Sequence, residues 1–396
     1  MRLRFCSLWA VAAWLLGSAA PMPRVLHLSM YPYIPDAADA ALILKQGFEE
    51  AHPGVLLRIT LNENYYDATP GAGGVLEEDS DIHEIDAIFL KDFLDHHKLA
   101  PFSPGFAATV PQLYPLAQQA ALQGHVLVAV PHWLCSDFLF TRADQPALAS
   151  AHTLAALQVA LPPARGLLLD MTEPALGELI LSYFLGREAS AAGALADVKR
   201  GPDPALVRTM QQILALEPAG FGRNLADDTK PGFYARQFAR GAGSAFIGYS
   251  EATHDILEEG ETSCRAGDYC LAQADIHVGP WPFSEAEPHQ VVWVDMYGID
   301  AHVHGVLHQD AEDFIRYAMQ ASTYRALLVP HVGTPPRYLL PARADSYADK
   351  AILAAAPLYA RFLPILNNGI VVEAPALNAM LHKAAAAVSA ALPASH

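Results

Sequence analysis

Cys135 is the residue whose chemistry most needs an explanation in this sequence. The chain has four cysteines. Cys6 lies in an apolar N-terminal stretch, whereas Cys264 and Cys270 are close together in a polar segment, where they can form a disulfide with each other. Cys135 would then carry the one thiol without a partner. In a chain built for export, such a thiol is either deeply buried or has a chemical role.

The export argument comes from the N-terminus, which has the three parts of a secretory signal peptide over residues 1–20. A basic start, MRLR, is followed by the apolar run FCSLWAVAAWLLG and by the small residues Ser18-Ala19-Ala20. The apolar run is too short to span a membrane. We therefore expect a secreted or periplasmic protein from which Cys6 is removed together with the signal.

Length and charge narrow the class of function. The chain has 396 residues, and this length usually corresponds to two domains. Its net charge of −17 at pH 7 excludes nucleic acids and anionic membrane surfaces as partners, because phosphate binding needs clustered Lys and Arg. The charge suits a cationic or neutral small ligand, although many exported proteins are acidic only for solubility.

Strands and helices alternate in the N-terminal part of the chain, which predicts an α/β layer with a mainly parallel sheet. The β-branched and alternating residues of 24–35 and 55–63 predict strands. A helical pattern between them ends at Pro53-Gly54, a usual stop signal. Residues 83–98 then predict a short buried strand that runs into a helix.

The rest of the chain continues with both kinds of pattern. Residues 311–329 have apolar positions at helical spacing and predict one amphipathic helix. Further predicted elements are helices around 174–186 and 204–217, a strand over 290–303 and an Ala-rich helix after residue 372. We expect one lobe from residues 21–130 with about 276–345, a second lobe from residues 131–275, and C-terminal helices over residues 346–396.

Three segments resemble the type II periplasmic solute-binding proteins. They are a helix that ends FEEAHPGV, a GHVLVAVP strand followed by an apolar stretch ending in Thr-Arg, and the AEDFIRYAM helix. Proteins of this kind have two α/β lobes joined by crossover strands. The resemblance therefore implies a two-lobed α/β fold of the periplasmic-binding-protein type, with a ligand cleft between the lobes.

A more specific resemblance lies within this one. Five blocks occur in the same order as in the thiaminase I family, the thiamine pyridinylases: YPYIPD (31–36), IDAIFL (85–90), PHWLCSDFLF (131–140), GSAFIGYSE (243–251) and YLLPAR (338–343). The resemblance implies base exchange on thiamine. A cysteine thiolate adds to the pyrimidine, the thiazole leaves, and an amine or thiol takes its place, which is covalent catalysis.

The resemblance also assigns the two reacting groups. Cys135 matches the family nucleophile, and Glu251 matches the general base that takes the thiol proton. Without the family, Cys135 in its apolar surroundings is a buried structural cysteine. Glu251 would then complement the dipole of a helix over 251–259, with Ser250 as N-cap. The helix dipole lowers the pKa of a carboxyl group and burial raises it, and the sequence leaves open which effect is larger.

Substrate-binding residues follow from the same resemblance. Asp86 and Asp295 match family aspartates that would hold the amino group and ring nitrogen of the pyrimidine. Flat ligands pack well between aromatic faces, so we expect tyrosines in the ring pocket: Tyr31, Tyr33, Tyr234 and Tyr249. The alternatives are surface aspartates and core tyrosines. We expect small-molecule substrates, namely thiamine and an amine or thiol acceptor, no metal or organic cofactor, and a monomer.

The chain departs from the family pattern in two places. Ser136-Asp137 follows the cysteine where the family pattern leads us to expect Thr-Asn, and this puts a carboxylate two residues from the nucleophile. If Asp137 pointed toward the thiol, it would raise the thiol pKa. The segment 252–290 matches poorly, so the acceptor side of the cleft stays open.

Three other functions have some support in the sequence. The pentapeptide Gly248-Tyr249-Ser250-Glu251-Ala252 is close to the nucleophile elbow of serine hydrolases but lacks the final Gly. His302 and His304, with His308 beyond, would bind zinc if they shared one face of a strand. A non-catalytic binding protein that delivers thiamine or a related solute to a transporter would use the same fold. Such a protein has no need of Cys135.

Overall fold

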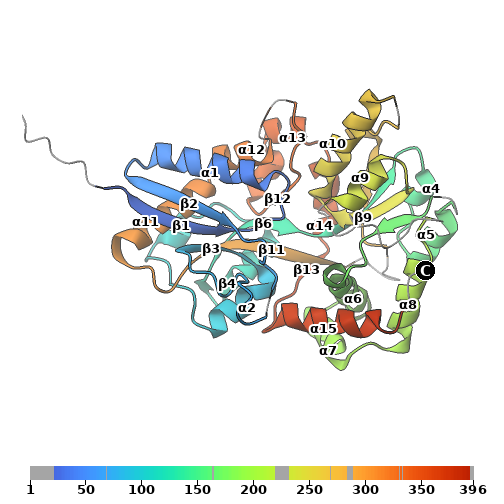
Figure 1. Ribbon diagram of the computed structural model, residues 1–396, viewed down its shortest axis with the longest axis horizontal. Helices are drawn as coiled ribbons and strands as arrows, with labels where there is room; N and C mark the ends of the chain where they lie inside the picture. Colours follow the sequence, from blue (N-terminus) through green and yellow to red (C-terminus); the bar gives the residue numbers. More distant parts are fainter. Residues whose placement is uncertain are drawn as a thin grey trace, which may run out of the picture.

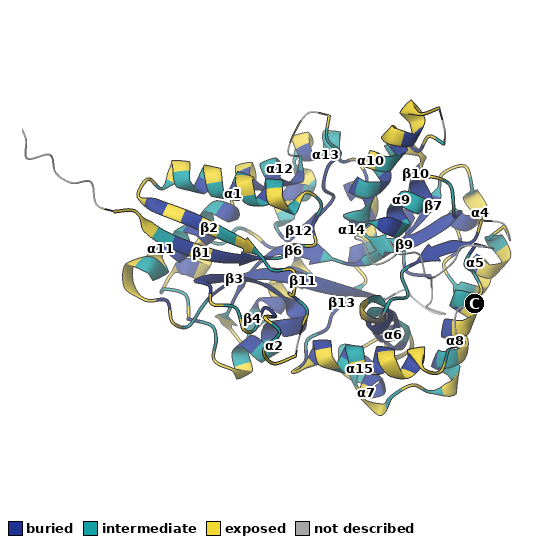
Figure 2. Ribbon diagram, viewed as in Figure 1, coloured by how far each residue is buried: buried dark blue, intermediate teal, exposed yellow. Residues whose placement is uncertain are grey.

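The computed structural model describes residues 22–67, 69–162, 165–218, 232–267, 269–282, 289–329, 331 and 333–392. The predicted signal peptide lies outside these residues. Figure 1 shows two lobes side by side, each built around its own β-sheet. The strands at the centre of each lobe are buried, whereas the outer faces of the helices are exposed (Figure 2). The prediction of a two-lobed α/β protein is confirmed.

The larger sheet has a mixed strand arrangement. Its spatial order is β12 (Leu340–Pro341), β6 (Val130–Cys135), β11 (Gln290–Ile299), β3 (Ile82–Asp86), β1 (Arg24–Met30) and β2 (Val55–Leu61), and β13 (Gly369–Val371) also pairs with β11. β1 is parallel to β2 and β3, but β11 is antiparallel to β3 and β6. The predicted mainly parallel sheet is therefore wrong for the sheet as a whole, because β11 returns from the other lobe and runs opposite to β3 and β6.

Two central strands of this sheet carry polar side chains in a fully buried setting. Every residue of β3 and of β11 is buried. Glu84 and Asp86 on β3 and Asp295 on β11 are among them. Burying a carboxyl group costs free energy unless it is hydrogen-bonded or paired. Packing alone does not explain these residues, so the two strands mark a candidate site.

Helices cover both faces of the larger sheet. In α1 (Ala37–Ala51), the buried residues Ala40, Leu44 and Phe48 recur every four positions and form one apolar stripe. The other helices of this lobe are α2 (Ala87–Asp95), α3 (Pro115–Ala120), α11 (Gly305–Ala318), α12 (Ala321–Leu328) and α13 (Lys350–Ala355), with 3-10 turns at Phe106–Thr109 and Ala344–Ala348. A short hairpin, β4 (Leu122–Gln123) and β5 (Val126–Leu127), lies before β6.

The smaller sheet is the core of the second lobe. Its order is β10 (Ile276–Gly279), β7 (Asp137–Arg142), β9 (Ala245–Tyr249) and β8 (Leu167–Leu169). The helices around it are α4 (Pro146–Ala149), α5 (Leu154–Ala160), α6 (Glu173–Glu188), α7 (Ala191–Arg200), α8 (Pro204–Leu214), α9 (Phe233–Ala239), α10 (Ala252–Arg265) and α14 (Tyr359–Leu366), with a 3-10 turn at Gln273–Asp275.

The chain crosses between the lobes at Ser136. β6 ends at Cys135 in the larger sheet, and β7 begins at Asp137 in the smaller one. Ser136 is buried, and its hydroxyl donates to the Val291 carbonyl at 2.8 Å and accepts from the Gln290 amide at 3.0 Å. The first residues of β11 therefore support the crossover, and the thiol of Cys135 lies at the junction of the lobes.

The C-terminal helix α15 (Leu377–Ser389) packs against α6 and α7 of the second lobe and against α2 of the first. Figure 1 shows it running beneath both lobes. The predicted limit between residues 130 and 131 falls within β6 of the larger sheet, and the predicted limit at 276 falls on the first residue of β10 in the smaller sheet. The predicted lobe limits themselves stay a prediction.

The single helix predicted over 311–329 is wrong. The structure has α11 and α12 instead, with a break at Met319 and Gln320, where Gln320 has an extended backbone. The break turns α12 so that the Tyr324 hydroxyl donates to the His132 carbonyl on β6 at 2.8 Å. In the part of the chain that the structure describes, no helix has the length and apolar character needed to cross a bilayer.

Candidate active site

Cys135 is half-buried at the end of β6, directly opposite Trp293 on β11. Its thiol lies 3.5 Å from Asp295 Oδ2 and is oriented to donate to it. Cys135, Tyr31 and Tyr249 pack against one apolar cluster that includes Trp293. The cysteine is therefore neither fully buried nor isolated, because a carboxyl group and aromatic rings from both lobes surround it.

The surroundings of Cys135 favour a neutral thiol. Burial raises the thiol pKa well above its usual value, and the nearby carboxylates of Asp295, Glu251 and Asp86 raise it further. A neutral thiol reacts only after a base or a nearby cation stabilises the thiolate.

Asp86 and Asp295 form a buried carboxyl pair. They are Cα partners across β3 and β11. The Asp86 carboxylate caps α2 by accepting from the Ile88 amide at 2.9 Å and also accepts from the Tyr66 hydroxyl at 2.9 Å. Burial raises the pKa of Asp86 to about 6, and burial with the charges of Asp86 and Glu84 raises the pKa of Asp295 well above its usual value. The pair therefore retains a proton near neutral pH.

Glu251 stands at the start of α10, but the predicted N-cap is wrong. Glu251 itself occupies the N-cap position, no side chain caps the helix, and the Ser250 hydroxyl instead donates to Glu251 Oε2 at 3.2 Å. Burial raises the pKa of Glu251 to about 7, although its own backbone amide and Ser250 act in the opposite direction. Burial thus outweighs the helix dipole, and a carboxyl with this pKa suits a general base near neutral pH.

The four predicted tyrosines do not share one place. The Tyr31 hydroxyl lies 3.2 Å from the Tyr66 hydroxyl, and its ring contacts Tyr33 at 5.5 Å between centroids. Tyr33 is 38% exposed and stacks on Tyr66 at 6.0 Å. Tyr249 ends β9, and its hydroxyl donates to Glu178.

The fourth predicted tyrosine, Tyr234, lies on α9, where its ring packs edge-on against Phe233. The structure therefore brings Tyr31 and Tyr249 close to Cys135. Tyr33 contacts the ring of Tyr31 and lies further from the thiol. Tyr234 packs against the larger hydrophobic cluster, as does Tyr31.

A cavity of about 620 Å³ opens on the outer side of Tyr66. Its volume lies in the range of small-molecule sites. The hydroxyl of Tyr66 reaches Asp86, while the ring contributes to the cavity wall. The cavity is lined by Tyr33, Glu63, Asn64, Tyr66, Asp67, Thr69, Ala379 and His382.

Sequence reasoning missed several residues around Cys135. Tyr65 and Tyr66 lie in the loop that follows β2, and this aromatic pair within a polar loop was a usable signal. Glu178 is a single charged residue in the apolar run LGELILSYF of α6, which also signals a buried carboxyl. Glu84 gave no such signal. It is fully buried, accepts from the Tyr31 amide at 2.8 Å and lies 2.9 Å from His132 Nε2.

The geometry does not support the metal or serine-hydrolase alternatives. His302 contacts Asp300 and Asp81, and His308 contacts the Pro101 carbonyl. Among the described residues, no group of histidine, cysteine and acidic side chains could hold a metal ion. The Ser250 hydroxyl donates to Glu251, and the nearby His254 contacts Asp36 and backbone carbonyls of Pro335 and Pro336.

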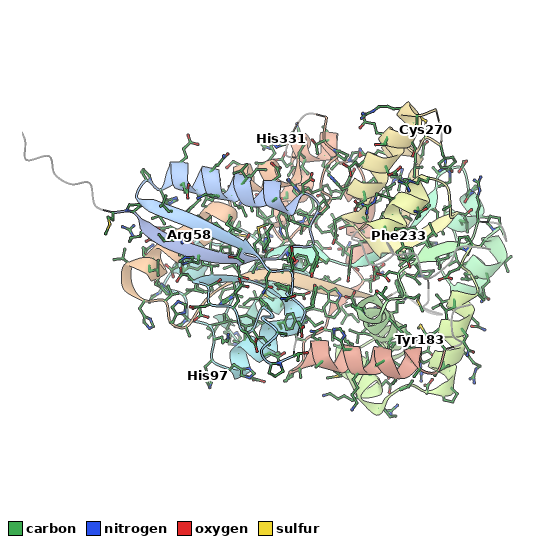
Figure 3. The ribbon with its side chains drawn as sticks, viewed as in Figure 1. Arg58, His97, Tyr183, Phe233, Cys270 and His331 are labelled. Atoms are coloured by element: carbon green, nitrogen blue, oxygen red, sulfur yellow. A yellow bond between two sulfur atoms is a disulfide. The ribbon has the colours of Figure 1, made fainter. Side chains whose placement is uncertain are left out.

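The remaining cysteines lie away from the lobe junction. Cys264 and Cys270 are bonded to each other. Figure 3 shows Cys270 at the outer end of α10, on the surface of the second lobe. In the described part of the chain, Cys135 is the free cysteine.

The fold defines the class of protein. The structure superposes on the maltose-bound T. maritima MalE3 with a TM-score of 0.68 at 14% identity, covering 93% of this chain and 95% of that chain. It superposes on the Clostridium botulinum thiaminase I in complex with thiamin with a TM-score of 0.75 at 17% identity, covering 92% and 99%. The protein is a two-lobed α/β protein of the periplasmic-binding-protein type.

Sequence comparison narrows this class. The chain is 25% identical over 368 residues to Thiaminase-1 of Paenibacillus thiaminolyticus, covering 89% of this chain and 83% of that protein. No protein-family model matches the chain. The chain is a homologue of thiaminase I, which confirms the resemblance carried by the five sequence blocks.

Proposed function

We propose that the protein is a thiaminase I that exchanges the base of thiamine for an amine or thiol. One observation carries the proposal: the free thiol of Cys135 lies 3.5 Å from the buried Asp295 carboxyl at the junction of the two lobes. A protein that only binds its ligand has no need for a thiol among carboxyl groups. The homology to Thiaminase-1 supports the same assignment.

The proposed reaction begins with proton transfer from the Cys135 thiol to Glu251. The thiolate adds to the pyrimidine ring, and the bond from the methylene carbon to the thiazole nitrogen breaks, so that the nitrogen takes the electron pair. Glu251 releases the thiol proton to solvent, and the acceptor then attacks the methylene carbon and gives up its own proton to the ionised Glu251. Loss of the Cys135 thiolate from the ring completes the exchange. Each step is easier than a direct displacement.

Asp86 and Asp295 have a complementary role in this proposal. A carboxyl pair that retains one proton offers both an acceptor and a donor. The ionised group would accept from the pyrimidine amino group, and the protonated group would donate to a ring nitrogen. Protonation of that nitrogen stabilises the electrons that the thiolate pushes into the ring. Tyr31 and Tyr249 would pack against the ring faces, with Tyr33 and Tyr234 as further candidates in the ring pocket.

The charge of the substrate explains how a neutral thiol becomes reactive. Thiamine carries a positive charge on its thiazolium ring, and the groups around Cys135 are carboxyls. A cation bound beside these groups favours the thiolate and the carboxylates over their protonated forms. We infer that Cys135 is activated by the substrate itself and is unreactive in the empty protein.

The proposal also includes the location, oligomeric state and cofactor requirement expected from the sequence. The N-terminal signal would direct the protein to the periplasm or outside the cell, where it would act as a monomer without a metal or organic cofactor. We also propose that the lobes close on the ligand. Small-angle scattering should show a smaller radius of gyration with bound thiamine, and an unchanged radius would count against closure.

The test is mass spectrometry of purified protein incubated with thiamine and pyridine or aniline. The expected products are free thiazole and a pyrimidine–amine adduct, both missing with Cys135→Ala. Intact thiamine together with measurable binding would favour the second candidate, a transport-type binding protein. The conserved fold makes this second candidate physically reasonable, but it leaves the Cys135–Asp295 contact without a purpose.

A further inference from the structure

We propose that Asp137 and Glu178 hold one proton between them and that Glu178, in this state, is a positioning residue that fixes Tyr249 and Trp293 beside Cys135. Both carboxyl groups lie in the second lobe, behind the proposed nucleophile. The kinetic part of this inference rests on the proposed function. Its spectroscopic part does not.

Glu178 forms hydrogen bonds with residues of two strands, β9 and β11. It projects from α6 and accepts a hydrogen bond from the Tyr249 hydroxyl at the end of β9. It also hydrogen-bonds with the indole of Trp293. Trp293 is the residue directly opposite Cys135 on β11. One carboxyl group therefore determines where two aromatic rings lie, one from each side of the thiol.

Asp137 faces Glu178 from the start of β7. It is the Cα partner of Tyr249 across β7 and β9. Both carboxyl groups line a small cavity of about 10 Å³, which is room for about one water molecule. The cavity wall consists of Ser136, Asp137, Glu178, Ser182, Trp281, Gln290, Val291 and Trp293. The two carboxyls can thus share a proton directly or through one water.

Among the described residues, the charges that raise the pKa values of the pair come from other carboxyl groups. Glu178 faces Asp137 on β7 and Asp86 at the start of α2, in addition to the Tyr249 phenol. Asp137 faces Asp170, which follows β8, and contributes to the field at Glu251. Ionised carboxyls that line the same small cavity repel each other, which favours a state in which one of them keeps its proton. Burial raises the pKa of Asp137 to about 7 and that of Glu178 to about 8.

A shared proton has a consequence for the hydrogen bonds. When Glu178 is protonated, its hydroxyl donates toward Asp137 while its carbonyl oxygen accepts from Tyr249 and Trp293. A glutamine has the same pattern, with an amide donor in place of the acid proton. When the pair loses the proton at alkaline pH, repulsion separates the two groups and moves both aromatic rings. Activity should therefore fall as the pH rises through about 8.

The kinetic test compares pH profiles of kcat/KM for thiamine. Glu178→Gln should keep neutral-pH activity within about threefold and lose the alkaline fall, because the amide cannot ionise. Asp137→Asn should also lose the alkaline fall, because either neutral variant leaves one ionisable carboxyl. Glu178→Leu removes the acceptor and should raise KM about tenfold, in line with the usual cost of an unpaired buried donor. If activity is retained in Glu178→Gln but reduced in Glu178→Leu, the role of Glu178 is to position the two aromatic rings.

The spectroscopic test needs no turnover. Infrared spectroscopy at pH 7 should show the carbonyl band of a protonated carboxylic acid that is lost in Glu178→Gln and in Asp137→Asn. If the difference spectrum between the parent and either variant lacks that band, the proposal that Asp137 and Glu178 share a proton is wrong. An alkaline fall that is identical in the parent and in Glu178→Gln overturns the positioning role, because a merely structural carboxyl changes stability but leaves the pH profile alone. If the parent protein does not turn over thiamine, the proposed function fails, and the infrared result still decides this inference.

Discussion

Asp86 and Asp295 are direct partners across β3 and β11, and Asp295 reaches the Cys135 thiol at 3.5 Å. Two acids in such a position cannot both ionise at low cost, because burial and mutual repulsion disfavour the second charge. The arrangement lowers stability at the pH where both groups ionise, a cost that the proposed role of the pair in holding the pyrimidine would explain. This relationship has a measurable consequence for folding.

The Asp86→Asn variant should be more stable than the parent protein at pH 8. The pKa of Asp86 rises from an ordinary value near 4 in the unfolded chain to about 6 in the folded protein. The folded state therefore binds more protons between these values, and stability is highest below pH 4 and falls as the pH rises to about 6. Asn avoids this loss and still caps α2. The expected gain at pH 8 is about 3 kcal/mol.

Urea unfolding at pH 8 and at pH 4 measures this difference. The gain should be present at pH 8 and largely absent at pH 4, where Asp86 is neutral in the folded protein. Glu50→Gln, a change at an exposed position on α1, serves as the matched control and should change stability little at either pH. An Asp86→Asn variant that is less stable than the parent at pH 8 would contradict the buried-pair interpretation.

Replacement of the proposed nucleophile should separate binding from catalysis. Cys135→Ser and Cys135→Ala should each lower kcat by several orders of magnitude, because the covalent step is lost. Thiamine binding by calorimetry should stay within about tenfold of the parent, since the carboxyl and aromatic groups remain. Turnover retained in either variant would remove Cys135 from the mechanism.

Much of the fold could be predicted because its signals are local. The apolar positions of α1, the strand patterns of β1 and β2 and the long strand β11 follow from side-chain periodicity. The mixed direction of the larger sheet does not, because β11 pairs with β3 across a separation of about two hundred residues. The break between α11 and α12 also depends on a distant contact, from Tyr324 to β6.

The candidate site shows the same division. Cys135, Asp86, Asp295 and Glu251 could be proposed from motif order, and the pKa of Glu251 could not, because it depends on how deeply α10 begins within the protein. Asp137 looked like a neighbour of the thiol, but it faces the smaller cavity, since the chain turns between lobes at Ser136. Strand alternation does not predict side-chain direction across such a crossover.

The number of free thiols tests the cysteine assignment without any kinetic assumption. The Cys264–Cys270 disulfide leaves one free thiol once the predicted signal peptide is removed. Thiol titration of the secreted protein in denaturant should therefore give one equivalent, and three after reduction. In the folded protein without ligand, alkylation of Cys135 should be slow because the thiol is neutral. Three thiols before reduction would exclude the disulfide.

Glu251→Gln should abolish the acid side of the pH profile. The parent needs Glu251 ionised to accept the thiol proton, so kcat/KM should rise with pH through about 7, below the alkaline fall expected near pH 8. Glutamine can accept the Ser250 hydrogen bond but cannot take a proton, so kcat/KM should fall by roughly 10²- to 10⁴-fold at all pH values. Glu258→Gln, on the exposed side of the same helix, should match the parent. A Glu251→Gln variant that keeps the same acid limb would assign that limb, and the base, to another carboxyl, of which Asp86 with its pKa of about 6 is the first to test.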